Sequence, residues 1–235
     1  MAASASGITF DGNAMNLVGA ANIVDGSIQM VSRGASGGAA WLTSDVSTAN
    51  SFDASFTFSL QSNGSSPMAD GITFAMQNQG TNALGDTGGS LGYGGLGAVG
   101  SVIQTYTNNK AGLNTDGNAY NTQSAPAYLG YASLVTGTEN VKYDVSSNTL
   151  SMTGTLNVDG KSFDISDSKA IDLAAKFGRT MTMGFTGASG DSYSDERINS
   201  FSLASVSAVP EPETYAMLLA GLGLMGFMSR RRKNS

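Results

Sequence analysis

The stretch Phe52-Asp53-Ala54-Ser55-Phe56-Thr57-Phe58-Ser59-Leu60 decides the fold class of this chain of 235 residues. Its apolar side chains occupy every second position, and polar side chains lie between them. A period of two predicts an antiparallel β-strand with one face buried and the other in water. Burial of one phenylalanine side chain contributes about 1.5–3 kcal/mol, so we expect the apolar face of this strand in the core.

Similar short segments recur on both sides of this strand. Residues 139–145 and 150–156 flank a short polar turn and predict a β-hairpin, and Asp159-Gly160 predicts another tight turn. One helix is expected at residues 168–177, with Gly178 as its cap. The remaining strands are expected at residues 8–10, 17–23, 27–31, 72–76, 102–107, 128–134, 180–185 and 198–203.

The composition agrees with many strands joined by turns, because glycine is abundant at 31 residues and hydrophobic residues make up 40%. A chain of this length suits one large β-sandwich or jelly roll. Three long polar segments, at residues 77–100, 108–124 and 186–195, are expected to be surface loops. The first of them is rich in glycine and is too long for a hairpin turn, so it is a candidate for function.

Charge and residue usage exclude several functions. Only 13% of the residues are charged and the net charge is −6, so the composition gives no electrostatic footprint for nucleic acid. The chain contains no cysteine, which removes disulfide and thiol chemistry. It also contains no histidine, which removes the commonest general base and the commonest transition-metal ligand.

Catalysis is not expected. Ser-His-Asp chemistry requires a histidine. Glycosidases of related sandwich folds place two carboxylates on one face of a strand, which gives acids that alternate along the sequence. The pair Asp195-Glu196 is adjacent instead, so the two side chains would point to opposite faces.

The C-terminal segment has a three-part order. Pro210-Glu211-Pro212 is followed by an uncharged apolar run at residues 215–228, and Arg230-Arg231-Arg232 ends it. This order resembles the PEP-CTERM sorting signal of Gram-negative bacteria. The resemblance implies recognition by an exosortase at the inner membrane, transient anchoring there, removal of the tail, and release to the cell surface or exopolysaccharide. The apolar run is shorter than the ~20 residues that span a bilayer, so a tail anchor or an interfacial helix is the alternative.

Several motifs between residues 8 and 205 resemble those of legume-type (L-type) lectins. The first is Ala69-Asp70-Gly71-Ile72-Thr73-Phe74, and the others follow in the family's order. They are Ala39-Ala40-Trp41 with the strand at 52–58, Gly88-Gly89-Ser90-Leu91-Gly92-Tyr93, Thr105-Tyr106-Thr107-Asn108-Asn109, residues 141–150, and residues 184–188 with 198–201.

The resemblance implies a sugar site formed by Asp70, by Gly88 or Gly89, and by Asn108, and a cis peptide bond between Ala69 and Asp70. The chemistry of these residue types suits a sugar. A carboxylate accepts charge-assisted hydrogen bonds from two hydroxyl groups, and an amide both donates and accepts. Backbone N–H groups of glycine can approach a ligand closely because no Cβ intervenes.

The metal site of the family is altered in this sequence. Gln104 stands where the family has a bridging aspartate, and no histidine is available, so no transition metal is expected. Calcium needs only oxygen ligands. Gln104, the Tyr106 carbonyl, Asn108 and Asp116 are the residues that could supply them, with a single charge and therefore low affinity.

The sequence thus predicts an all-β, concanavalin-like antiparallel β-sandwich (jelly roll) with a short C-terminal membrane helix. Residues 1–7 are expected to be the start of a mature chain, residues 8–206 the lectin-like sandwich, and residues 207–235 the sorting tail. The first hypothesis for function is an exported glycan-binding protein of the cell surface or exopolysaccharide matrix. A structural matrix protein without sugar binding is the alternative, and a glycoside hydrolase ranks last.

Overall fold

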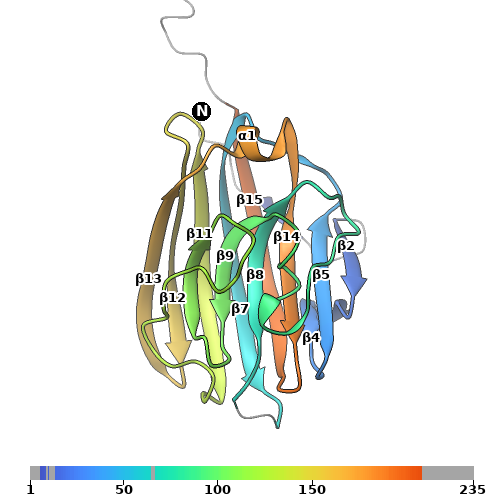
Figure 1. Ribbon diagram of the computed structural model, residues 1–235, viewed down its shortest axis with the longest axis vertical. Helices are drawn as coiled ribbons and strands as arrows, with labels where there is room; N and C mark the ends of the chain where they lie inside the picture. Colours follow the sequence, from blue (N-terminus) through green and yellow to red (C-terminus); the bar gives the residue numbers. More distant parts are fainter. Residues whose placement is uncertain (1–5, 9, 11–13, 65–66, 208–235) are drawn as a thin grey trace, which may run out of the picture.

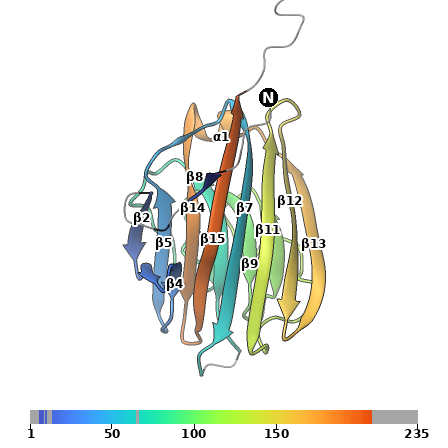
Figure 2. The same ribbon diagram turned by 180° about the vertical axis from the view of Figure 1, so that it is seen from behind.

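Two antiparallel sheets pack face to face in the computed structural model, which describes residues 6–8, 10, 14–64 and 67–207 (Figure 1). The front sheet runs in the order β10 (Lys110–Asn114), β9 (Val99–Gln104), β8 (Gly71–Gln77), β14 (Thr180–Ser189), β5 (Ser36–Leu42) and β2 (Met15–Gly19), with β6 (Val46–Ser47) paired to β14. The back sheet, nearest the viewer in Figure 2, runs in the order β13 (Lys161–Ala170), β12 (Thr149–Val158), β11 (Leu134–Asp144), β7 (Asn50–Ser62), β15 (Ser194–Ser207), β4 (Ser27–Val31) and β3 (Asn22–Val24), with β1 (Ser6–Gly7) paired to β15. The predicted all-β sandwich is confirmed.

The core lies between the sheets and has aromatic rings at its centre. Strand β7 alternates between buried and half-buried residues, as its sequence predicts. Phe56 of β7 and Phe201 of β15 project from the back sheet, and Phe74 of β8 and Phe185 of β14 project from the front sheet. The ring centroids of contacting pairs in this cluster lie 5.1–5.8 Å apart, in tilted and edge-on geometries. Aromatic pairs favour these arrangements, so the cluster holds the two sheets in a fixed relation.

The predicted hairpin is also confirmed, because β11 and β12 pair along ten residues and β12 continues through Asp159-Gly160 into β13. The helix α1 (Leu173–Phe177) is shorter than predicted. Residues 168–170 belong to β13 instead, where they pair with β12. Asp172 caps the N-terminus of the helix, because its side chain accepts a hydrogen bond of 2.9 Å from the N–H of Ala175.

Four other segments differ from the prediction. Residues 108–124 are not one loop, because they contain β10, whose Gly112 interrupts the apolar pattern. Residues 128–133 form turns and not a strand; the carbonyl of Gly130 accepts a bond of 2.7 Å from the N–H of Met68. The third predicted loop shrinks to residues 190–193, since β14 continues to Ser189 and β15 begins at Ser194. At the N-terminus the strand is β1, which precedes residues 8–10.

The glycine-rich loop at residues 78–98 is packed onto the outer face of the front sheet. Trp41, Leu91 and Tyr93 are fully buried in a second apolar cluster beneath it. The indole N–H of Trp41 donates to the carbonyl of Ala83 at 2.8 Å, and the Tyr93 hydroxyl donates to the side chain of Asn114 at 2.8 Å. The loop is therefore held on the sheet by Trp41 of β5 and by two of its own few large side chains, Leu91 and Tyr93.

In the part of the chain that the structure describes, no helix is both long enough and apolar enough to cross a membrane. The predicted C-terminal membrane helix and the rest of the sorting tail lie outside the described residues.

Candidate functional site

Five segments that are far apart in the sequence meet around one cavity of about 270 Å³ at one end of the sandwich. Asp70 lies immediately before β8, and Gly88 and Gly89 belong to the short 3-10 helix η1 (Gly88–Ser90). The turn between β9 and β10 contributes residues 106–108, and the turn between β14 and β15 contributes residues 190–192. The structure therefore brings together every residue that the resemblance placed in a sugar site: Asp70, Gly88, Gly89 and Asn108.

The backbone of Asp70 is fixed on both sides. Its N–H donates to the carbonyl of Ala188 at 3.0 Å, and its own carbonyl accepts from the N–H of Thr105 at 2.8 Å. The Ala69–Asp70 peptide bond is cis, as predicted. The next residue, Gly71, has a φ of 127°, and a Cβ there would lie 2.0 Å from the carbonyl oxygen of Ile103, so only glycine fits.

The carboxyl group of Asp70 is shielded from water but lies against the cavity. Only 4% of the residue is exposed, and burial raises the pKa of Asp70 to about 6, an effect that a hydrogen bond from the backbone of Gly190 partly offsets. Glycines surround the oxygens: a Cβ at Gly88 would lie 3.9 Å from Asp70 Oδ2, and one at Gly190 would lie 3.6 Å from it. The carboxylate thus faces backbone and open space, where a ligand hydroxyl can reach it.

Beneath Asp70 lies a second buried acid that the sequence interpretation did not assign to the site. Glu196 of β15 is fully buried, and its Oε1 accepts bonds from the N–H of Gly71 at 2.9 Å and the hydroxyl of Ser194 at 3.1 Å. The Ser194 hydroxyl also lies 3.0 Å from the carbonyl of Ala69. Burial raises the pKa of Glu196 well above its ordinary value. Glu196 and Ser194 therefore support the Ala69–Asp70 segment from the core side.

The period-two pattern could have revealed this support. Ser194, Glu196 and Ile198 occupy alternate positions and are all buried, so extending the predicted strand back from residue 198 places Glu196 on the inner face. Asp195 points outward instead and pairs with Arg197, with 2.8 Å between Arg197 Nη2 and Asp195 Oδ2. The predicted divergence of Asp195 and Glu196 is confirmed.

Hydrogen bonds within the protein hold the turn that carries Asn108. The side-chain amide of Gln104 donates to the carbonyl of Gly89 at 2.6 Å, which joins this turn to the glycine-rich loop. The hydroxyl of Thr105 donates to the carbonyl of Met68 at 3.1 Å. Asn109 donates to the carbonyl of Ala127 at 2.8 Å through its side chain, whose oxygen accepts from another loop N–H at 2.7 Å.

The four predicted calcium ligands do not meet around one point. Gln104 faces Lys110 at one end of the β9–β10 hairpin, whereas Asn114 faces Gly100 at the other end, about 13 Å away along the strand. Asp116 follows Asn114, and its carboxylate accepts bonds of 2.7–2.9 Å from Asn114, Asn118 and Asn121. It does not line the cavity. The donor set therefore does not fit a calcium ion.

Within the described ranges there is also no group of three or more His, Cys, Asp or Glu residues that could hold a metal. Tyr106 and Asn108 do line the cavity. The hydrogen bonds that Gln104, Thr105 and Asn109 make to other protein groups hold the turn, and they account for the position of these two residues without a metal ion.

A tyrosine that the sequence interpretation missed completes the cavity. Tyr120 lies in the segment after β10, is 42% exposed, and its hydroxyl occupies the position that a Cβ at Gly89 would need, 2.1 Å away. Burial raises the pKa of the Tyr120 phenol, and the negative charge of Asp70 adds to this effect. No periodic pattern marks Tyr120, because it lies in a turn of small polar residues.

Two comparisons bear on this chain. A model of the PEP-CTERM protein-sorting motif matches residues 208–233. The sandwich is similar to solved plant lectin structures. Peanut lectin with a 9mer peptide has a TM-score of 0.73 and 23% identity, over 88% of this chain and 100% of its own. A lectin from Bauhinia forficata in complex with GalNAc has a TM-score of 0.72 and 21% identity, over 88% and 100%.

A third neighbour is arcelin-5, a lectin-like defense protein from Phaseolus vulgaris, with a TM-score of 0.72 and 20% identity over 87% of this chain and 99% of its own. Identities at this level show a common fold. The chain combines the legume-lectin (concanavalin-like) sandwich with a C-terminal PEP-CTERM sorting motif.

Proposed function

We propose that this protein is an exported lectin-like protein that binds a carbohydrate in the Asp70 cavity. The observation that carries the proposal is the environment of the Asp70 carboxylate, which is almost fully buried and yet faces a cavity walled by Gly88 and Gly190. Such a group accepts strong, charge-assisted hydrogen bonds from neutral donors. Its own negative charge disfavours anionic ligands.

The other groups around the cavity match the remaining parts of a sugar. Glycine backbone at residues 88–89 lets a ligand approach N–H groups closely, and the Asn108 side chain supplies both a donor and an acceptor. The ring of Tyr120 offers an apolar face for sugar C–H groups. A neighbour of the same fold was solved in complex with GalNAc, which agrees with this choice of ligand class.

The alternative hypotheses have less support. A retaining or inverting glycosidase needs two carboxyl groups at the reacting bond. Glu196 is fully buried behind the backbone of Gly71 and bonds to it, so it is a structural acid in this arrangement. The specific observation in favour of a structural matrix protein is that the predicted calcium ligands are not assembled, and the binding experiment below decides between the two.

The sorting motif supports the cellular part of the proposal. A PEP-CTERM motif implies export through an exosortase at the inner membrane of a Gram-negative bacterium. We propose the cell surface or the exopolysaccharide matrix as the destination, where a glycan-binding domain would meet its ligand.

Glycan-array screening followed by isothermal titration calorimetry tests the proposal. The Asp70→Asn variant keeps the shape of the side chain but loses its charge, and we expect it to lose at least about tenfold in affinity for any sugar that the wild type binds. Asp25→Asn is the matched control, because Asp25 lies in the exposed turn between β3 and β4. Wild-type binding that persists unchanged in Asp70→Asn would show that the cavity is not the sugar site.

A further inference from the structure

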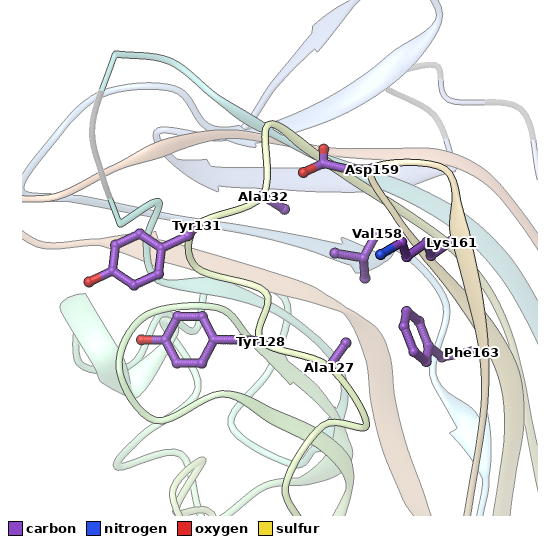
Figure 3. Close-up of a pocket in the computed structure, with 8 residues that line it drawn as sticks. All are labelled: Ala127, Tyr128, Tyr131, Ala132, Val158, Asp159, Lys161 and Phe163. Carbon is purple, nitrogen blue, oxygen red and sulfur yellow. The ribbon is translucent and has the colours of Figure 1, made fainter.

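A second concave surface lies outside the Asp70 cavity and has an exposed aromatic pair on its rim. Tyr128 is 45% exposed and Tyr131 is 70% exposed. Their rings stack, with centroids 5.2 Å apart and planes inclined by 21°, and Figure 3 shows both hydroxyl groups pointing to the same side. Adjacent exposed rings form a contiguous apolar patch, which is a candidate ligand or partner site in a way that a single exposed side chain is not.

The pair is held in place before any ligand arrives. Leu129, between the two tyrosines, is fully buried, and Ala132 is 6% exposed, so the segment is anchored in the core between the two rings and directly after Tyr131. The side chain of Asn109 bonds to the carbonyl of Ala127 and the N–H of Leu129. A ligand would therefore meet a rigid surface and would not have to order a loop.

The cavity beside the pair measures about 460 Å³, a volume in the range of small-ligand sites. Val158 of β12 and Phe163 of β13 line it opposite the tyrosines, together with Lys161 (Figure 3). Asp159 lies at its edge, and its carboxylate accepts bonds of 3.0 Å from the N–H groups of Ser133 and Leu134. The surface thus has apolar faces, one ammonium donor and one fixed carboxylate acceptor.

We infer that this surface, the Tyr128–Tyr131 site, binds a pyranose unit of a polysaccharide. A pyranose ring presents C–H groups on one face, which pack on an aromatic ring, and hydroxyl groups at its edge, which bond to groups such as Lys161 and Asp159. A second copy of the chain fits less well. The large exposed apolar side chains here are Tyr128, Tyr131 and Leu134, and so few residues cannot supply the ~800 Å² per partner of a stable interface.

The two sites are close in the structure, because Asn108 lines the Asp70 cavity and its neighbour Asn109 bonds to Ala127 at the second site. Two sites on one domain raise the affinity for a polymer far more than that for a monosaccharide. The choice of a saccharide as ligand rests on the proposed function. The experiment below distinguishes failure of this inference from failure of the proposed function.

The test is calorimetric titration with cellohexaose, xylohexaose, mannohexaose and chitohexaose, and with the corresponding monosaccharides. The wild type is compared with Tyr128→Ala/Tyr131→Ala, with Tyr128→Phe/Tyr131→Phe, with Asp70→Asn and with Ile23→Ala, which removes an exposed apolar side chain of similar exposure elsewhere. We expect the double alanine variant to lose roughly tenfold in hexasaccharide affinity but to keep the monosaccharide affinity. The double phenylalanine variant should keep both, because it retains the rings, and unchanged thermal unfolding verifies that each variant folds.

Hexasaccharide affinity that is unchanged in the double alanine variant but lost in Asp70→Asn would overturn this inference and leave the proposed function standing. The opposite pattern would support the Tyr128–Tyr131 site and overturn the role of the Asp70 cavity. Dimers in sedimentation that vanish in the double alanine variant would assign the tyrosines to self-association and overturn the inference. A wild type that binds no hexasaccharide at all overturns both.

Discussion

The side-chain amide of Gln104 donates a hydrogen bond of 2.6 Å to the backbone carbonyl of Gly89. This bond joins the end of β9 to the glycine-rich loop and therefore connects two walls of the Asp70 cavity. The carbonyl of Gly89 is only half-buried, so loss of this bond costs about 0.5–1.5 kcal/mol, the net value of a typical protein hydrogen bond. We predict that Gln104→Leu lowers the free energy of unfolding by this amount and weakens sugar binding, as measured by urea denaturation and calorimetry.

The matched control is Gln123→Leu, since Gln123 also donates to a backbone carbonyl, that of Ser166, but on the exposed surface. We expect this variant to change stability by less than about 0.5 kcal/mol and to leave binding unchanged. Equal effects of the two substitutions would mean that the Gln104–Gly89 bond has no special role.

Calcium should have little effect on this protein. The turn carrying Asn108 is held by Gln104, Thr105 and Asn109 through hydrogen bonds to protein groups, and Asp116 is bonded elsewhere. A ligand that binds only the folded state raises the melting temperature. We therefore predict the same melting temperature and the same sugar affinity in millimolar calcium and in EDTA. A melting temperature that rises by several degrees with calcium would contradict the conclusion that these residues do not form a calcium site.

Sugar binding should depend on pH through Asp70. Burial raises the pKa of this carboxyl to about 6 in the free protein. Binding requires the ionised form, which accepts hydroxyl hydrogen bonds, so affinity should be constant above about pH 7 and fall as the pH drops through 6. Below that pKa the decline approaches tenfold per pH unit, which titrations between pH 5 and 8 would reveal. Affinity that is flat over this range would contradict a role for the Asp70 carboxylate.

A methyl group at residue 88 should block the cavity. Gly88 has a φ of 61°, and an added Cβ would lie 3.9 Å from Asp70 Oδ2, where the ligand is expected. Gly97 has the same φ of 61° and nothing within 4 Å of an added Cβ. Both Gly88→Ala and Gly97→Ala should cost about 1–2 kcal/mol in stability through the left-handed backbone. We expect only Gly88→Ala to lose sugar affinity, and equal binding by the two variants would place the ligand elsewhere.

Stability should fall as the pH rises toward neutrality, because of Glu139. This residue of β11 is 3% exposed and accepts a bond of 2.6 Å from Ser101 of β9, and burial raises its pKa from 4.5 to about 7. The folded state thus holds the proton more tightly than the unfolded state. The stability from this group is complete below about pH 4.5 and is lost as the pH rises through 7.

The chain has no histidine, but burial also raises the pKa of Asp70 and of Glu196, so these two carboxyl groups add to the same fall and Glu139→Gln removes only the share of Glu139. We predict that Glu139→Gln reduces the fall in unfolding free energy between pH 4.5 and 8 by about 3 kcal/mol, measured by urea denaturation at each pH. The exposed-residue variant Asp25→Asn should keep the wild-type slope. A wild type whose stability rises with pH would contradict the prediction.

The sequence predicts the features that depend on local pattern. Alternation gives β7 and the β11–β12 hairpin, because each buries one face and exposes the other. The glycine, aspartate and asparagine motifs place Asp70, Gly88 and Asn108 in one site. These residues come from separate loops, which have no periodic pattern. The order of their motifs along the chain, which resembles that of the lectin family, is what predicts that they lie together.

The features that the sequence does not predict depend on contacts between distant segments. β10 was missed because Gly112 leaves no side chain in the pattern; its Cβ would collide with Gln123 and Thr122. Residues 128–133 have the composition of a strand, but bonds to Met68 and Asn109 bend them into turns. Asp116 has the right residue type for a calcium ligand, yet the register of the hairpin carries it to the wrong end.

Trp41 and Tyr93 fix the glycine-rich loop from beneath, whereas Gly88 and Gly89 face the cavity. The residues that fold the loop are therefore different from the residues that would meet a ligand. Substitutions at the cavity face can accumulate in related proteins without unfolding the loop, and the anchor can stay constant while the preferred glycan changes. Such a division would let one sandwich follow a changing ligand through evolution.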